Sequence, residues 1–445
     1  MAHNAHNIPW QNIAADLKYI EKRFPLCSGR TNMFPMHKPG QAGRWNHFVR
    51  VFTKTIEDCV VSERSKYSDA YEPFADDEPV ISKDVAARIG GTVTRYCQAT
   101  FHGQWDKSHC VHCYHYHWEP WMGSSPEKWG SKLNDPKHNP KCSCVTSHTS
   151  ATMSAFLVDW RRHSMDPYPS DSLEITKILI LHREMETLLR LVAHPGFCLS
   201  KRWSQCCEMC WGKKCGMEEM LDMTLMAYIC LNVLYLHPET WDEQYRKARD
   251  KMDYRKTSAY QMMLVRCTRV VNKDLDTHMY PHREFFGVPR NMFPCQGCWD
   301  NSEFGTGDLQ EIALQKEYLP NNSNIPEAIN ILGSKGLPVE LSLEILELAD
   351  YRPAGRLPIP DDPLHVRNAQ ELRKYLRYCW KMLVNIRLLC QESGETINWE
   401  EKVADCVWKL WGQDFPKMLE RTYPYGEEDR AVFVDVDKLG RLKKV

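Results

Sequence analysis

The spacing of apolar residues predicts alternating strands and helices in the middle of the chain. Residues 174–180 contain three isoleucines and a threonine, which favours a buried strand. Residues 185–192 have apolar residues at helical spacing, and His194-Pro195-Gly196 is expected to stop that helix. Residues 197–200 are typical of a second short strand, and another helix is expected to begin at Cys207. The predicted order is strand, helix, strand, helix.

The longest apolar stretch, residues 220–236, is interrupted by Asp222, Thr224 and Asn232. A helix that spans a bilayer needs about 20 predominantly apolar residues, and this stretch is shorter and carries a charge. We interpret it as a buried part of the core and expect no membrane contact.

Helical patterns are also present near both ends of the chain. Residues 12–23 predict a first helix. Asn368 and Glu371 have the spacing of a helix N-cap and its acidic partner, and the helix that they open is expected to end near Gly394. Residues 429–437 alternate in polarity like a short strand.

Composition and charge narrow the class of protein. The chain has 445 residues, of which 43% are hydrophobic and 11% aromatic, so it can bury a core and global disorder is excluded. Its formal net charge is −1, so any contact with nucleic acid would need a local basic patch. The first residues lack the pattern of a secretory signal, and we therefore expect an intracellular protein, cytoplasmic or nuclear and not secreted.

Cysteine usage favours metal binding over disulfides. The chain has 19 cysteines, and in a chain without a secretory signal these are better interpreted as metal ligands or free buried thiols. Three Cys-x-x-Cys pairs occur, and a segment rich in cysteine and histidine precedes residue 150. The candidates for structural zinc binding are Cys110, Cys113, Cys142, Cys144, Cys295 and Cys298.

These patterns divide the chain into five regions. They are an N-terminal region of unknown role (1–95), a Cys/His-rich segment (96–150), a core (151–300), a linker (301–335) and a helical C-terminal region (336–445).

One cluster of residues has the spacing of a catalytic zinc site. His182, Cys207 and Cys210 offer one imidazole and two thiolates, which would hold zinc and leave a fourth position for water. Glu184 stands two residues after the histidine. Because zinc lowers the pKa of bound water toward about 7, Glu184 would act as the general base and acid that moves the proton of that water.

His-x-Glu followed by Cys-x-x-Cys resembles the signature of zinc nucleobase deaminases. Residues 174–210 are most similar to a divergent filamentous-fungal branch of the cytidine-deaminase-like superfamily, in which a Gly-x-x-x-Ser-Lys stretch precedes the cysteines, as Gly196 to Lys201 does here. Cys206 stands where that family usually has proline. The resemblance implies an α/β fold, a mixed sheet flanked by helices, with zinc as the cofactor. It also implies hydrolytic deamination of a nucleobase in a nucleoside, RNA or DNA, or a degenerate relative without turnover.

Two alternatives remain open at this point. His237 and Glu239 with Cys295 and Cys298 form a second His-x-Glu and Cys-x-x-Cys set. In the simpler interpretation the histidines and glutamates are ordinary surface residues and the cysteines are buried free thiols.

A different class of function is suggested by residues 337–345. The sequence Leu337-Pro-x-Glu-Leu-x-x-Glu-Ile345 resembles the first helix of an F-box, the module that docks ubiquitin-ligase scaffolds. The resemblance implies a non-enzymatic, zinc-stabilised adaptor whose C-terminal helices bind a protein partner. The sequence fixes neither the oligomeric state nor the substrate.

Overall fold

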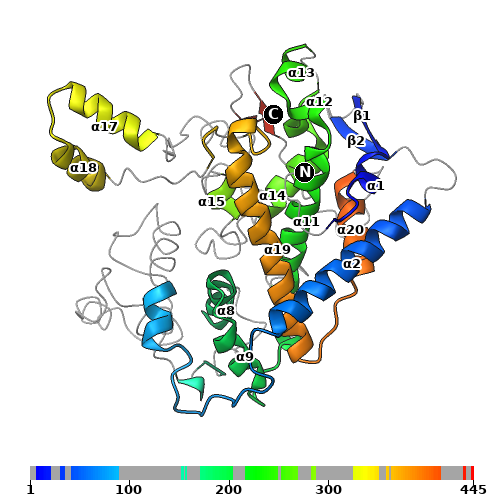
Figure 1. Cartoon of the computed structure of the whole chain (residues 1–445), viewed down its shortest axis with the longest axis vertical. Helices are drawn as coiled ribbons and strands as arrows, with labels where there is room; N and C mark the ends of the chain where they lie inside the picture. The colour runs from blue at the N-terminus through cyan, green and yellow to red at the C-terminus, as the bar shows by residue number, and fades with distance from the viewer. Residues whose placement is uncertain are drawn as a thin grey trace, which may run out of the picture.

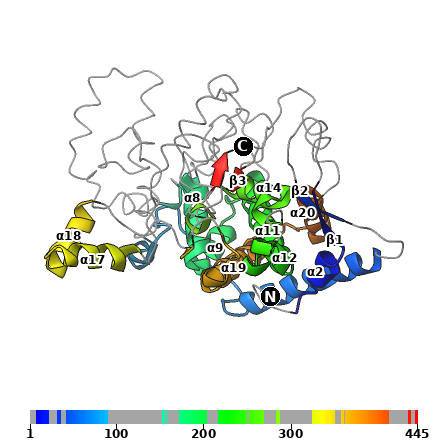
Figure 2. The same ribbon diagram turned by 90° about the horizontal axis from the view of Figure 1, so that it is seen from above.

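A computed structural model describes the chain over fourteen stretches, and helices dominate them (Figures 1 and 2). The described residues are 7–21, 31–35, 42–89, 152–154, 156–157, 171–203, 216–248, 252–268, 282–286, 324–349, 357–359, 362–411, 434–436 and 442–444.

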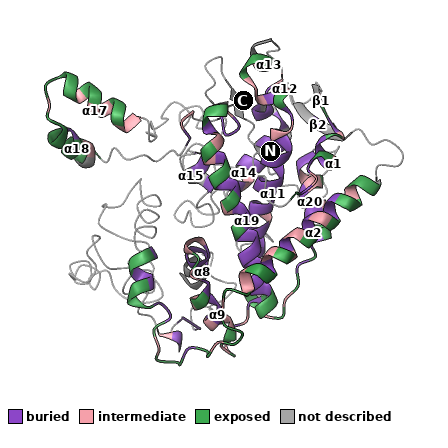
Figure 3. Cartoon of the chain, in the orientation of Figure 1, coloured by how far each residue is buried: buried purple, intermediate pink, exposed green. Residues whose placement is uncertain are grey.

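The core is built around one helix, α11 (Met217–Tyr235), against which α14 (Ser258–Thr268), α19 (Ala369–Glu392) and α20 (Trp399–Trp411) pack; α2 (Ala42–Arg64) packs in turn on α19 and α20. Helix α11 is apolar around most of its circumference and is buried over nearly its whole length (Figure 3). A helix with apolar residues on every side is stable in water only when neighbours surround it. Helices α14, α19 and α20 supply most of these neighbours.

Aromatic rings fill the contact between the N-terminal and C-terminal parts of the chain. The ring of Trp10 lies 5.3 Å from that of Phe48 and 5.5 Å from that of Tyr228. Trp380 on α19 packs edge-on against Phe52 and lies 5.3 Å from Tyr228. Each such pair adds about 0.5–1.5 kcal/mol to what area burial alone contributes. Residues far apart in the sequence therefore share one core.

Partly buried ion pairs fix how the helices meet. Lys402 on α20 donates to Glu218 at 2.6 Å and to Asp222 at 2.8 Å, both on α11. Burial opposes the charged form of Lys402, but these two carboxylates raise its pKa above the ordinary value. On the other side of the core, Glu57 on α2 accepts hydrogen bonds from Arg387 and from the indole nitrogen of Trp399.

The other elements are short or lie beside this core. They are α1 (Gln11–Ala14), β1 (Leu17–Glu21), β2 (Thr31–Pro35), α8 (Asp171–His182), α9 (Met185–Ala193), α10 (Ser200–Trp203), α12 (Pro238–Trp241), α13 (Glu243–Ala248), η5 (Tyr254–Lys256), α15 (His282–Phe286), α17 (Asn324–Ser334), α18 (Val339–Leu348), η7 (Val366–Asn368), β3 (Val434–Val436) and β4 (Leu442–Lys444). In the described part of the chain the strands form two separate antiparallel pairs, β1 with β2 and β3 with β4.

The predicted α/β fold, a cytidine-deaminase-like mixed sheet flanked by helices, is wrong. Residues 174–180, predicted as its first strand, lie inside α8, and the predicted strand at 197–200 is absent from the described residues, where α10 begins at Ser200. A short continuous apolar run is compatible with a buried helix as well as with a strand. In α8 the side chains of Leu179 and Ile180 are buried, so packing against neighbouring helices outweighs the strand preference of the isoleucines.

Several local predictions are confirmed. Residues 220–236 lie almost entirely in the buried helix α11, and α9 ends at Ala193, just before His194. Helix α19 begins after Asn368 and is followed by Gly394 at φ +75°. The helix predicted at 12–23 is wrong, because α1 ends at Ala14 and β1 begins at Leu17. Among the helices that the structure describes, none is both long and apolar enough to cross a membrane.

Candidate functional site

Helices α17 and α18 form a hairpin that lies to one side of the helical core in both views (Figures 1 and 2). The turn between them is fixed by Gly336, whose φ of +87° suits glycine. The amide of Leu337 donates to the carbonyl of Leu332, and that of Gly336 donates to that of Gly333. This is the Schellman pattern of hydrogen bonds, which ends α17 and turns the chain sharply into α18.

Most of the described hairpin is exposed (Figure 3), and several of its exposed side chains are large and apolar. None of the described side chains of α17 is buried. The exposed fraction is 55% for Ile331 on α17, and on α18 it is 54% for Val339, 47% for Leu341, 50% for Leu343, 40% for Ile345 and 81% for Leu348. Single exposed apolar residues are ordinary on protein surfaces, whereas large contiguous apolar patches are associated with interaction sites.

The helical repeat places these side chains on two flanks of α18. Ser342 is buried, and α17 is the element that packs on α18, so we infer that Ser342 marks the side of α18 nearest α17. Leu341, Ile345 and Leu348 follow spacings of four and three and so share one flank, whereas Val339 and Leu343 share the other. Apolar side chains therefore border the α17 contact on both sides.

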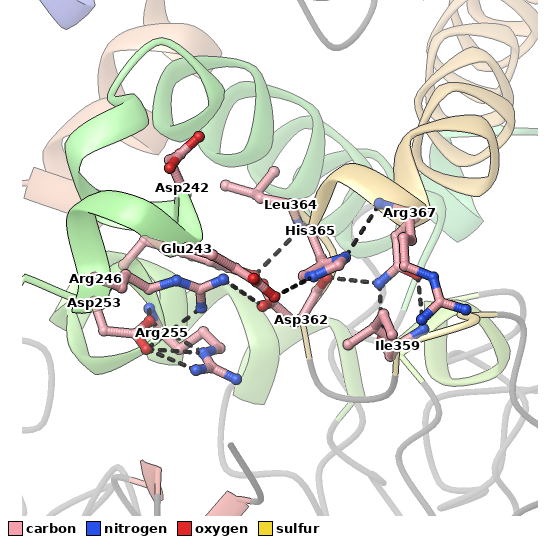
Figure 4. A network of polar contacts seen from close by, with 12 residues as sticks. Asp242, Glu243, Arg246, Asp253, Arg255, Ile359, Asp362, Leu364, His365 and Arg367 are labelled. Carbon is pink, nitrogen blue, oxygen red and sulfur yellow. Dashed lines mark hydrogen bonds and ion pairs between the residues drawn. The ribbon is translucent and has the colours of Figure 1, made fainter. Parts of the chain in front are cut away.

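A buried network of polar contacts anchors the chain where it returns from the hairpin to the core (Figure 4). Asp362 accepts a hydrogen bond from the Tyr254 hydroxyl at 2.7 Å and one from the Arg246 guanidinium at 2.7 Å. Asp253 accepts hydrogen bonds from Nε and Nη2 of Arg255, the shortest at 2.7 Å, and from its backbone amide. At this centre of the network the carboxylates of Asp253 and Asp362 face the guanidinium groups of Arg246 and Arg255, so these four charges balance.

The same network has backbone and histidine contacts. Asn368 donates to the carbonyls of Ile359 and Asp362 and accepts from the amide of Ile359. His365 accepts from the amide of Arg367 through Nδ1, which leaves Nε2 to donate to Glu243 at 2.9 Å. Sequence analysis missed these residues because Tyr254 and Asp362 lie far apart along the chain and no local pattern connects them.

The predicted catalytic residues are placed only in part. His182 is the last residue of α8. Glu184 precedes α9, and both of its carboxylate oxygens accept from Arg88, at 2.6 and 2.9 Å. Cys207 and Cys210 lie outside the described residues, so a zinc site formed with His182 stays a prediction.

Of the second predicted zinc site, His237 and Glu239 are described by the structure and the two cysteines are not. His237 Nδ1 lies 3.0 Å from Glu239 Oε1, and this hydrogen bond lowers the pKa of Glu239. His237 Nε2 is buried and has no hydrogen-bond partner in the described part of the chain. A carboxylate that holds one ring nitrogen is a common support for a metal-binding histidine. Its proposed companions Cys295 and Cys298 lie outside the described residues.

No described group of three or more His, Cys, Asp or Glu side chains is arranged to hold a metal ion. The structural zinc candidates Cys110, Cys113, Cys142 and Cys144 also lie outside the described residues. Seven described cysteines are free thiols, namely Cys59, Cys198, Cys230, Cys267, Cys379, Cys390 and Cys406. Burial raises the thiol pKa of six of these seven, all except Cys198, which keeps those six protonated.

Comparison with known proteins gives one match. The model of a protein family described as "Gramillins biosynthetic cluster protein GRA5" matches residues 11–422, which include every helix of the core and the α17–α18 hairpin. No curated protein and no solved structure matches the chain.

Proposed function

The chain belongs to the family described as Gramillins biosynthetic cluster protein GRA5, and we propose that it acts as a non-enzymatic adaptor that binds a partner protein through the α17–α18 hairpin. The family description associates its members with a biosynthetic gene cluster. An adaptor would contribute to such a system by bringing proteins together.

The exposed apolar surface of α18 carries this proposal. Full burial of a leucine, isoleucine or valine side chain contributes about 1.5–3 kcal/mol. A partner that covered Leu341, Ile345 and Leu348 would gain several kcal/mol, which is enough to offset part of the entropic cost of association. Isolated helices of this length are marginally stable in water, so a partner would also stabilise the hairpin itself.

The sequence of α18 indicates which partner to test. Leu337, Pro338 and Leu341 occupy the positions that give residues 337–345 their resemblance to the first F-box helix. The helix begins at Val339, directly after Pro338. We therefore propose that the partner is the scaffold subunit of a ubiquitin ligase.

The proposal is tested by measuring the affinity of the full chain for a purified fungal ubiquitin-ligase scaffold subunit by titration calorimetry. We expect a wild-type complex and at least 100-fold weaker binding for a Leu341→Asp/Ile345→Asp variant, because each buried carboxylate would lose its hydration. Val61→Asp is the matched control, since Val61 is an exposed apolar residue on α2. Circular dichroism of all three proteins should be the same.

Two results would contradict the proposal. One is no binding of the scaffold by the wild-type chain at concentrations where its circular dichroism shows it folded. The other is binding that the Leu341→Asp/Ile345→Asp variant retains in full.

A further inference from the structure

Helix α15 is a short element held in the core by aromatic side chains. Its residues His282, Phe285 and Phe286 are all buried. The ring of Phe285 stacks on that of Tyr375 with centroids 3.8 Å apart and planes 2° from parallel. Phe286 and His282 pack edge-on against the same ring, at 5.6 and 5.7 Å. Tyr375 on α19 is thus the common contact of all three α15 side chains.

The polar atoms at this contact form a neutral chain. His282 Nδ1 is hydrogen-bonded to the Tyr375 hydroxyl, and that hydroxyl is also hydrogen-bonded to Cys379. Cys267 on α14 lies close enough to influence the same tyrosine. Arg283 and Glu284 occupy the intervening positions of α15.

A positive charge on the buried His282 ring would have no negatively charged group hydrogen-bonded to it among the described residues. Tyr375, Cys379 and Cys267 have pKa values raised by burial and are neutral at physiological pH. In the described part of the chain no carboxylate accepts a hydrogen bond from the His282 ring. An imidazolium here would be a buried charge without a counter-ion, which is strongly unfavourable.

We propose that α15 is an acid-released latch, in which protonation of His282 detaches α15 from Tyr375 on α19. One proton passes from solvent to the imidazole ring, and the imidazolium regains its hydration only when α15 leaves the core. Phe285 and Phe286 leave with it, which uncovers the face of Tyr375.

The pH range of the latch follows from the burial of His282. Burial lowers the pKa of His282 from its ordinary value of 6.5 to about 4. Between these values the released form binds a proton that the docked form does not bind, so acid favours release. Above pH 6.5 the docked form keeps its full stability relative to the released form. This relative stability is lost progressively as the pH falls to about 4. At pH 5 the docking equilibrium constant should be about 30-fold smaller than at pH 7.5.

The test is amide hydrogen exchange of the full chain at pH 7.5 and pH 5.0, read by mass spectrometry and corrected for the intrinsic exchange rate. We expect amides of α15 to lose protection about 30-fold, while those of α11 serve as the internal reference. A His282→Leu variant, which cannot take up the proton, should show α15 protection that does not depend on pH.

A second measurement needs only the wild-type chain. Deuterium exchange at the C2 position of each histidine reports its pKa, and we expect His282 to titrate below pH 5. Titration of His282 near 6.5 would overturn the proposal, as would equal loss of protection by α15 and α11 on acidification.

Discussion

Replacing Asp362 by alanine removes two acceptors from the buried polar network. The carboxylate is 4% exposed and accepts from the Tyr254 hydroxyl and from Arg246. After the substitution, among the described residues, Arg246 keeps only Asp253, at 3.7 Å, and the hydroxyl of Tyr254 has no acceptor for its proton. The Tyr254 hydroxyl stays buried, and the Arg246 side chain is only 14% exposed.

The expected loss of stability is large because a charge is left behind. Removing one partner of a buried ion pair costs about 3–5 kcal/mol, and a buried hydroxyl without a partner costs about 1–3 kcal/mol. The remaining contact between Arg246 and Asp253 reduces the first value. We expect a total of about 3–5 kcal/mol, a large fraction of the roughly 5–15 kcal/mol that stabilises most folded proteins.

Urea unfolding followed by circular dichroism measures this loss. Asp362→Asn should fall between wild type and Asp362→Ala, because the amide oxygen still accepts from Tyr254 while the charge is gone. Glu371→Ala is the control, since Glu371 pairs with a half-exposed lysine and such pairs contribute little. A destabilisation below about 1 kcal/mol for Asp362→Ala would refute the view that the network anchors this segment.

Three further predictions concern a turn, the thiols and zinc. Gly394→Ala should destabilise the chain by about 1–2 kcal/mol in thermal unfolding, because φ is +75° while an added Cβ would meet no atom within 4 Å; an unchanged melting temperature would contradict this. In native-state alkylation read by mass spectrometry, Cys198 should react before Cys379, because the hydrogen bond with Ser200 lowers the pKa of Cys198. The reverse order would contradict the surroundings that the structure gives to these two thiols. Elemental analysis should find about one zinc fewer in Cys207→Ser/Cys210→Ser than in wild type, and equal zinc contents would remove the predicted site.

Local patterns in the sequence identified individual helices better than their assembly. The N-cap spacing at Asn368 and the glycine at 394 bound α19 correctly, because helix ends are governed by nearby residues. Even there the reason differs from the expected one. The Asn368 side chain does not cap the helix and bonds instead to the backbone of Ile359 and Asp362.

The strand predicted at 174–180 failed for a physical reason. Isoleucine and threonine favour strands only weakly, and context can reverse the preference. A helix is satisfied by its own backbone hydrogen bonds, whereas a strand needs a neighbour, and no neighbouring strand is present among the described residues. The F-box-like pattern at 337–345 identified a helix, but its exposed flanks became apparent only in the structure.

Helix α11 and the helices α19 and α20 that pack on it are far apart in the sequence, and this has a consequence for folding during translation. Helix α11 is apolar on nearly every side, yet α19 and α20, which cover part of it, are synthesised more than 130 residues later. At roughly 5–20 residues per second, the ribosome needs on the order of ten to thirty seconds to proceed from the end of α11 to the end of α20. During that interval the faces of α11 that α19 and α20 cover would be exposed on the nascent chain, so we expect the protein to depend on chaperones that shelter apolar helices until these two helices are made.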